Sequence, residues 1–524
     1  MLRPGRLLVA ALIAVCALTL ALALSQGLSS APGPTTVPTP AGVLRLSWDD
    51  PETLDPALAQ DTRSHGVVLQ LFSGLVRLDQ QLAVEPALAA SWQVSADGRT
   101  YTFTLREDAR FQDGRPISAS DVKYSLERAA DPRLHSPTAA TYLGDIVGVG
   151  EKLAGKADEI AGVRVRDERT LAITIDSPKV YFLAKLTYPT AAVVDRANVE
   201  SGSDWTEHPN GSGPYRLISR DQDWLVLQRS QYAVGTAAAP REIRFYVGQR
   251  TAMQMYETKQ LDVIEVGLGD LERALDPRGQ LYDDLVVSPS MSLFYLGLDA
   301  TSEPFRDRSV RRAFAEALDR EKLVRVTLKG AVRLATGILP PGMPGYYLDS
   351  KSLPYDPEAA RRELAASPYG GPPGLPPITV TGGLGDRFAE VYWGELAVPL
   401  EVQLVQQGFF QGLARHEYQM FVTGWVADYP DPENFLDLLL HSGSAGNHSG
   451  YSNPRVDSLL EQARGETDQQ RRWATYREAE SIALADAAIV PLYNDVDYRL
   501  VSPRVHGLEF TPLGLLSFDG ATVD

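Results

Sequence analysis

Three carboxylates lie close together near the C-terminal end of the chain, at Asp428, Asp431 and Glu433. Paired carboxylates can hydrolyse glycosides, which requires one protonated and one charged group. A single carboxylate between aromatic rings, here Trp425 and Tyr429, can instead hold an organic ammonium group. Such a charge-assisted hydrogen bond contributes about 1.5–3 kcal/mol. The stretch therefore indicates either a carboxylate-dependent hydrolase or a site that binds a cationic group.

The prolines around these carboxylates indicate which of the carboxylates has a structural role. Pro432 followed by Glu433 is typical of the start of a helix, and Asp431 then stands at its N-cap. Because Asp431 is used for capping, the hydrolase interpretation lacks a proton donor. Asp428 has no such structural task, so it is the candidate anchor. A solvated loop aspartate is the alternative interpretation.

No motif for nucleotide, metal or acyl chemistry occurs elsewhere. The chain has no Walker loop, no glycine-rich dinucleotide fingerprint, no HExxH and no GxSxG. Gly211–Tyr215 lacks the lysine of a phosphate loop and predicts a tight turn. His441 and His448 could bind a metal only with help from a carboxylate such as Asp437, and exposed loop histidines are the simpler interpretation. We therefore predict no catalytic residue, no cofactor and no bound metal.

The N-terminus has the pattern of an export segment. Arg3 and Arg6 precede an uncharged run from Leu7 to Leu24, which is the minimum length for a membrane span. Residues 1–25 are therefore either a signal that is cleaved near Ala23-Leu-Ser25 or a retained membrane anchor. Residues 26–42 form a spacer rich in proline and threonine, which is extended and semi-rigid.

Cys16 is the only cysteine of the chain, so an intramolecular disulfide and a cysteine-based metal site are impossible. A lipidated cysteine normally follows a small residue and ends the apolar run. Here Val15 is bulky and the run continues past Cys16. We expect Cys16 to be an ordinary apolar residue of the segment, with lipid attachment as the alternative.

The composition is that of a soluble globular protein. The chain has 524 residues, of which 44% are apolar and 22% charged, enough for about three domains. Acidic residues outnumber basic ones by 67 to 50, which gives a formal net charge of −17. Because binding to nucleic acid requires clustered lysine and arginine, we expect no nucleic-acid partner.

Local patterns mix strands and helices along the whole body. Alternation predicts a strand at Val43–Trp48 and another at Met420–Gly424, whereas helical spacing predicts a helix over Gly66–Leu78. Ser118 with Asp121 three residues later predicts a capped helix start. An intermixed order of this kind favours an α/β fold.

The body resembles the extracytoplasmic solute-binding proteins of ABC importers, in family 5, which contains peptide-, oligopeptide- and nickel-binding members. The order and spacing of the short matches make the resemblance specific. They are Leu54–Pro56, Leu71–Val76, Glu85–Trp92, Asp97–Leu105, Phe111–Pro116, Asp121–Ser125, Gly211–Tyr215, Pro304–Asp307, Val310–Phe314, Gly424–Leu436, Tyr451–Pro454 with Asp457, and Pro491–Tyr493.

The resemblance implies a two-lobed, type II periplasmic-binding-protein-like α/β fold with an additional inserted domain. Lobe I is expected to be discontinuous, made of residues 43–85, 210–290 and 495–524. Residues 86–209 are the inserted domain II, and residues 291–494 are lobe III. Ligand is expected between the lobes, which close around it.

In the peptide-binding members of the family an aspartate holds the α-ammonium group of the peptide, and Asp428 matches that position. The resemblance further implies that the backbone of Gly424–Val426 pairs with the peptide as an added strand. Trp425 and Tyr429 are then expected to form the cleft wall, with Trp48 facing from the opposite side.

The expected function is therefore capture of a peptide or similar small solute and its delivery to an ABC permease, without catalysis. The protein is expected to be a monomer on the periplasmic or extracellular face of the membrane, attached, if at all, through its N-terminal segment. A carrier of a nickel chelate or another solute is the alternative within the family. The carboxylate-dependent hydrolase is the alternative outside it.

Overall fold

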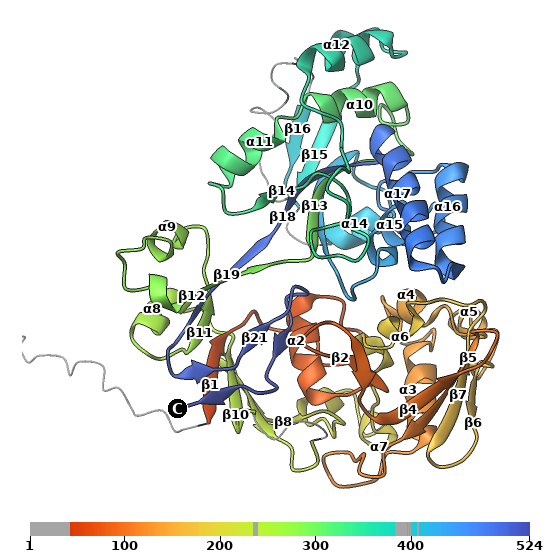
Figure 1. Cartoon of the computed structure of the whole chain (residues 1–524), viewed down its shortest axis with the longest axis vertical. Helices are drawn as coiled ribbons and strands as arrows, with labels where there is room; N and C mark the ends of the chain where they lie inside the picture. The colour runs from red at the N-terminus through yellow and green to blue at the C-terminus, as the bar shows by residue number, and fades with distance from the viewer. Residues whose placement is uncertain are drawn as a thin grey trace, which may run out of the picture.

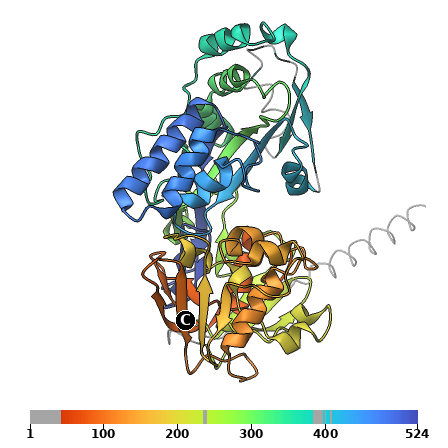
Figure 2. The same cartoon turned by 90° about the vertical axis from the view of Figure 1, so that its right-hand side faces the viewer.

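The protein has two halves joined by two neighbouring extended connections (Figures 1 and 2). The computed structural model describes residues 42–233, 239–382, 400–405 and 408–524, together with 393, 396 and 398. The predicted export segment and Cys16, with nearly all of the spacer, lie outside these residues. Within the described part of the chain, no helix is long and apolar enough to cross a membrane.

The lower half in Figure 1 contains a seven-stranded mixed sheet that gathers distant parts of the chain. Its central strand β1 pairs in parallel with β10 and β11. Helix α2 packs on this sheet, and α8 and α9 flank it. In spatial order the strands are β12 (Leu285–Pro289), β19 (Val496–Val501), β11 (Val263–Glu265), β1 (Val43–Ser47), β10 (Glu242–Tyr246), β9 (Trp224–Arg229) and β8 (Tyr215–Arg220), and the helices are α2 (Thr62–Leu71), α8 (Ala252–Glu257) and α9 (Leu271–Ala274).

A four-stranded antiparallel sheet lies beside it in the same half, with its own apolar core. Helix α3 begins at Ser118, whose side chain and that of Asp121 form the reciprocal capping box that the sequence predicted. The sheet consists of β4 (Ala89–Val94), β5 (Thr100–Leu105), β7 (Thr170–Thr174) and β6 (Val163–Val165). The helices are α3 (Ala119–Ala129), α4 (Ala139–Leu143), α5 (Val149–Leu153), α6 (Phe182–Lys185) and α7 (Arg196–Val199).

The upper half is built on a six-stranded sheet that is covered on both faces. Along β13, Leu293 and Tyr295 belong to one core and Leu296 and Leu298 to another, because successive side chains point to opposite faces. The strands are, in order, β14 (Arg333–Leu334), β18 (Ile489–Asn494), β13 (Ser292–Leu298), β17 (Met420–Val426), β15 (Ile378–Gly382) and β16 (Leu400–Gln403). The helices are α10 (Arg308–Glu316), α11 (Arg320–Lys322), α12 (Pro357–Ala366), α14 (Phe409–Ala414), α15 (Glu433–Leu440), α16 (Pro454–Gly465) and α17 (Gln469–Ala485).

Each of the three sheets draws its strands from one of the segment groups named above as lobe I, domain II and lobe III. We use these names for the three parts. The chain crosses between lobes I and III near Met291 and again near Asp495. The two crossings are tied together, since Asn494 donates to the Ser292 carbonyl at 2.7 Å. Two-stranded ribbons complete the fold: β2 (Val76–Leu78) with β3 (Val84–Pro86), β20 (Val505–His506) with β23 (Thr522–Val523), and β21 (Glu509–Phe510) with β22 (Leu516–Ser517).

The predicted helix over Gly66–Leu78 is wrong in its second half. Helix α2 is capped by Asp61 and ends at Leu71, after which the backbone is extended and leads to β2. The apolar spacing continues past this end because Phe72 is buried in the core of lobe I and Leu75 in that of domain II. The apolar residues of one periodic pattern are therefore buried in two different cores.

Gly66 of α2 allows the ring of Trp48 to lie directly on the helix. A Cβ atom at Gly66 would approach Trp48 Cζ2 to 2.4 Å, whereas a Cβ atom at Gly150 of α5 would meet nothing within 4 Å. We predict that Gly66→Ala lowers the free energy of unfolding by about 1–3 kcal/mol through overpacking. Gly150→Ala is the matched control and should be neutral or slightly stabilising, as urea denaturation would measure. Equal effects of the two changes would contradict this account.

Candidate functional site

Strand β17 has an edge that is only partly paired. On one side it pairs with β13 along its whole length, Met420–Val426. On the other side, parallel β15 pairs only as far as Val422 and ends at Gly382. Among the described residues, no strand pairs with Thr423–Val426 on that second side. This edge can therefore accept a further strand.

The register of the sheet determines which peptide groups face this edge. The N–H of Ala427 donates to the carbonyl of Met291 at 2.8 Å, so alternate residues of β17 bond to β13. By this alternation, the peptide groups of Thr423 and Trp425 point toward β13, and those of Gly424 and Val426 point toward the open edge. The structure thus brings the predicted Gly424–Val426 backbone into a position where it can pair with an extended ligand.

Asp428 follows the strand in a turn that Asn434 holds. The Oδ1 atom of Asn434 accepts from the backbone N–H of Asp428 at 2.9 Å and from the indole N–H of Trp425 at 3.3 Å. Asn434 lies in the first turn of α15 and is buried. One amide therefore fixes both predicted residues relative to each other. The ring of Trp425 is half-buried and packs against the core of lobe III.

The carboxylate of Asp428 is half-buried and is contacted from the other half of the molecule. Tyr142 of α4, in domain II, donates its hydroxyl to Oδ2, and Asn434 Nδ2 lies 3.5 Å from the same oxygen. Among the described residues, Oδ1 has no hydrogen-bond partner. Burial raises the pKa of Asp428 to about 7, although the two donors act in the opposite direction. Asp428 is therefore not a solvated loop residue, and no cation among the described residues neutralises it.

The sequence did not identify Tyr142 as part of this site. The residue lies 286 positions from Asp428, and no motif marks it. Its ring stacks on Tyr188 with centroids 3.6 Å apart, and His65 packs edge-on against Tyr188 at 4.9 Å. These buried rings fix the position of the hydroxyl group. Burial also lowers the pKa of His65 to about 4, so this imidazole is neutral at physiological pH.

Tyr429 and Trp48 do not line an exposed cleft wall in this structure. Tyr429 is 1% exposed, belongs to the cluster with Tyr142 and donates its hydroxyl to Glu433 at 2.5 Å. Trp48 donates its indole N–H to the carbonyl of Arg63 and packs against the core of lobe I. The structure brings Trp425, Asp428 and Tyr429 together but does not bring Trp48 to them.

Two other carboxylates of this region, Asp431 and Asp437, are engaged in structural contacts. Arg472 holds both oxygens of Asp431, at 2.7 and 2.8 Å, and the N–H of Glu433 donates to Asp431 at 2.9 Å. The predicted N-cap at Asp431 is wrong by one residue, because helix α15 begins at Glu433 and Pro432 is its N-cap. Both oxygens of Asp437 are held by Arg464, so Asp437 cannot complete a metal site with the neighbouring histidines. Within the described ranges, no group of three or more potential metal ligands occurs.

The described residues line hollows beside the lower half of the molecule. One of about 310 Å³ lies between α2, the β2–β3 ribbon and the C-terminal segment, and Asp428 is the lobe III residue that lines it. A larger one of about 760 Å³ lies beside α8 and α9, away from Asp428. This larger hollow is not a second candidate site for an ammonium group. Both oxygens of Asp262, which lines it, already accept hydrogen bonds from Arg45 or Arg504.

Two lobes, paired crossings, and a strand edge that ends in a carboxylate at the interlobe boundary define a two-lobed solute-binding protein. The model of the family described as "Bacterial extracellular solute-binding proteins, family 5 Middle" matches residues 83–447. The chain belongs to this family, which confirms the predicted family and fold class. Its members are extracellular solute-binding proteins.

Individual relatives are similar over nearly the whole chain. The periplasmic oligopeptide-binding protein OppA of Escherichia coli is 30% identical over 506 residues, covering 89% of this chain and 91% of that protein. The dipeptide-binding protein DppE of Bacillus subtilis is 26% identical over 503 residues, covering 90% of each.

Among solved structures, the murein tripeptide-binding protein MppA of Escherichia coli matches with a TM-score of 0.80, at 28% identity over 92% of this chain and 98% of that chain. A structure of MppA described as its unliganded open form gives a lower TM-score of 0.71, with 93% and 98% of the two chains covered. The present structure therefore matches that open form less closely than it matches the other MppA structure.

Because Asp428 is half-buried and its pKa is raised, the difference in stability between the wild-type protein and Asp428→Asn should depend on pH. Its pKa of about 7 in the folded protein exceeds the value of about 3.9 in an unfolded chain, so folding is opposed increasingly as pH rises from 4 through 7. We predict that Asp428→Asn stabilises the ligand-free protein at pH 8, by about 2 kcal/mol after discounting for partial exposure. Urea denaturation should show this gain vanish toward pH 4. A gain or loss that does not change with pH would contradict the assignment.

Proposed function

We propose that this protein captures a peptide, or a similar small solute with a free ammonium group, between its two halves. The observation that carries the proposal is the half-buried carboxylate of Asp428, which has no cation beside it in the described part of the chain and directly follows a strand with an open edge. An ammonium group would neutralise this carboxylate and restore its ionised form. Names of the relatives support a peptide, since they refer to dipeptides, oligopeptides and a murein tripeptide.

In this proposal the main chain of the ligand lies along Gly424–Val426 as an additional strand. The outward peptide groups of Gly424 and Val426 can bond to any main chain, so binding does not depend on the sequence of the ligand. Asp428 then fixes the end of the ligand that carries the ammonium group. Trp425 borders this position because Asn434 holds it beside the turn.

We further propose that the protein delivers its ligand to an ABC permease, acts as a monomer and performs no catalysis. A similar structure from Borrelia burgdorferi, with a TM-score of 0.81 and 27% identity, is described as an oligopeptide-binding protein of an ABC transporter; it covers 92% of this chain and 100% of that chain. Retention at the membrane through the N-terminal segment is part of the same proposal, and the apolar run from Leu7 to Leu24 supports it.

The proposed role of Asp428 is tested with trialanine, which has a free ammonium group, and N-acetyl-trialanine, which has none. We expect the wild-type protein to bind trialanine and to bind the acetylated peptide at least tenfold more weakly. Asp428→Asn should weaken trialanine binding by about 2 kcal/mol, because a charge-assisted hydrogen bond becomes a neutral one. Asp457→Asn, which removes a carboxylate elsewhere in lobe III, is the control and should leave the affinity unchanged in calorimetry.

Two results would contradict the anchor. The first is unchanged affinity of Asp428→Asn for trialanine, and the second is equal binding of the free and acetylated peptides. Hydrolysis of trialanine that Asp428→Asn abolishes would instead show that the protein is an enzyme.

The affinity for trialanine should depend on pH with a specific sign. Because the pKa of Asp428 is raised to about 7, the ligand-free carboxyl is increasingly protonated below pH 7 and must lose that proton to bind an ammonium group. Affinity should therefore rise between pH 5.5 and pH 7.5, and should fall above about pH 8 as the peptide amine loses its own proton. Calorimetry with Asp428→Asn should show no rise on the acidic side. An affinity independent of pH in the wild-type protein would contradict this prediction.

A further inference from the structure

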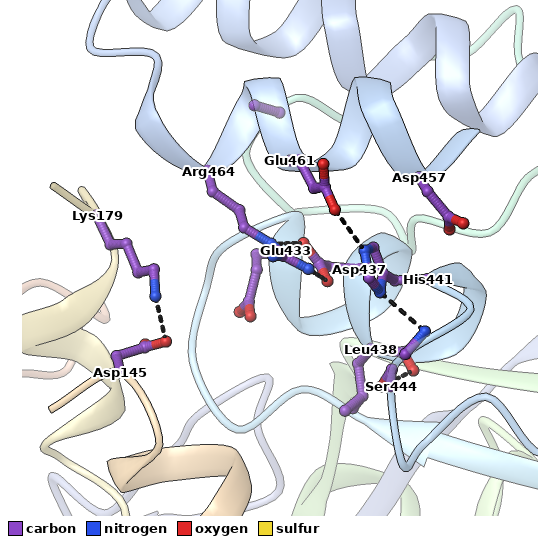
Figure 3. A network of polar contacts seen from close by, with 12 residues as sticks. Asp145, Lys179, Glu433, Asp437, Leu438, His441, Ser444, Asp457, Glu461 and Arg464 are labelled. Carbon is purple, nitrogen blue, oxygen red and sulfur yellow. Dashed lines mark hydrogen bonds and ion pairs between the residues drawn. The ribbon is translucent and has the colours of Figure 1, made fainter. Parts of the chain in front are cut away.

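A buried lysine of domain II reaches across to lobe III close to the anchor. Lys185 ends α6, is 5% exposed, and places its Nζ 3.1 Å from Asp145 Oδ2 and 3.3 Å from Glu433 Oε1. Asp145 belongs to domain II, whereas Glu433 is the first residue of α15 in lobe III. Figure 3 shows Asp145 with Lys179 on one side of this boundary and α15 with Glu433 on the other.

On the lobe III side, no cation among the residues of that lobe that the structure describes pairs with Glu433. Its neighbours Asp431 and Asp437 are each held by an arginine, Arg472 and Arg464 respectively. Among the described residues of lobe III, the bond from Tyr429 is the side-chain contact that Glu433 receives from its own lobe. Burial raises the pKa of Glu433 to about 7, and the ammonium of Lys185 opposes this shift.

On the domain II side, two buried lysines share one largely buried aspartate at the boundary. Asp145 is shared by Lys185 and by Lys179, whose Nζ lies 2.6 Å from it. Lys179 also contacts the exposed Asp176 at the surface. Each half thus presents one incompletely balanced buried charge, positive on domain II and negative on lobe III, and the two meet only where the halves touch.

We propose that Lys185 and Glu433 form a latch that holds the two halves closed and thereby positions Asp428 against Tyr142. Both cross-boundary contacts involve the short segment from Asp428 to Glu433, so one cannot open without straining the other. Separation would leave Glu433 without its cation, and of the two donors to Asp428 only Asn434 would remain. The latch rests on the proposed function, in which closure around a ligand is the event that matters.

The latch is tested by measuring the separation of the halves directly. Because Cys16 is the only cysteine, spin labels can be attached at Glu151→Cys in α5 and Gln462→Cys in α16 after Cys16→Ser. Pulsed electron paramagnetic resonance then reports the population of closed molecules without any ligand. We expect Lys185→Met and Glu433→Gln each to shift this population toward longer distances.

Controls separate a latch from a general loss of stability. Lys185→Arg keeps the charge and should restore the wild-type distances. Lys123→Met removes a lysine whose ion pairs, with Glu127 and Glu159, lie within domain II, and it should leave the distances unchanged. Combining Lys185→Met with Glu433→Gln should open the molecule no further than either change alone, because both remove the same interaction.

Binding of trialanine gives a second measurement. With either latch variant we expect about tenfold weaker affinity, equivalent to about 1.4 kcal/mol, and a faster dissociation rate with an unchanged association rate. Unchanged label distances in Lys185→Met and in Glu433→Gln, both folded by circular dichroism, would overturn the latch. If the distances shift as expected but trialanine does not bind the wild-type protein, the latch stands and the peptide proposal is wrong.

Discussion

The site depends on one constraint: carboxylates are buried where the two halves of the molecule meet. A buried carboxylate is unfavourable unless a hydrogen bond or a cation compensates for the lost water. Asp428 receives a hydroxyl from Tyr142 and Glu433 receives the ammonium of Lys185, and both donors come from the opposite half. The electrostatics of lobe III are therefore completed only by domain II.

This constraint links closure to binding. The two crossings between lobes I and III lie side by side, so the halves can rotate about them with few bonds broken. At the far side of the boundary, the segment from Asp428 to Glu433 faces α4 and α6 (Figure 1). A ligand that neutralises Asp428 would remove part of the cost of burying it. Binding and closure would then stabilise each other.

Much of the site could be predicted from the sequence because it is local. The strand, the proline-fixed turn and the contact of Asp431 with the helix start all lie within Met420–Glu433, where residue order determines which groups are neighbours. The predicted helix over Gly66–Leu78 failed for a related reason. Apolar spacing shows that residues are buried, but it does not say in which core, and Phe72 and Leu75 are buried in two.

The sequence by itself determined the family, the α/β class and the carboxylate that is best placed to hold a cation. Only the tertiary structure decided what surrounds that carboxylate, since Tyr142 and Lys185 lie hundreds of residues away and carry no motif. It also decided that Tyr429 is buried and that Trp48 belongs to the core of lobe I. The physical reason is that a raised pKa and a buried ion pair arise from burial and from partners in space, and neither follows from the order of residues along the chain.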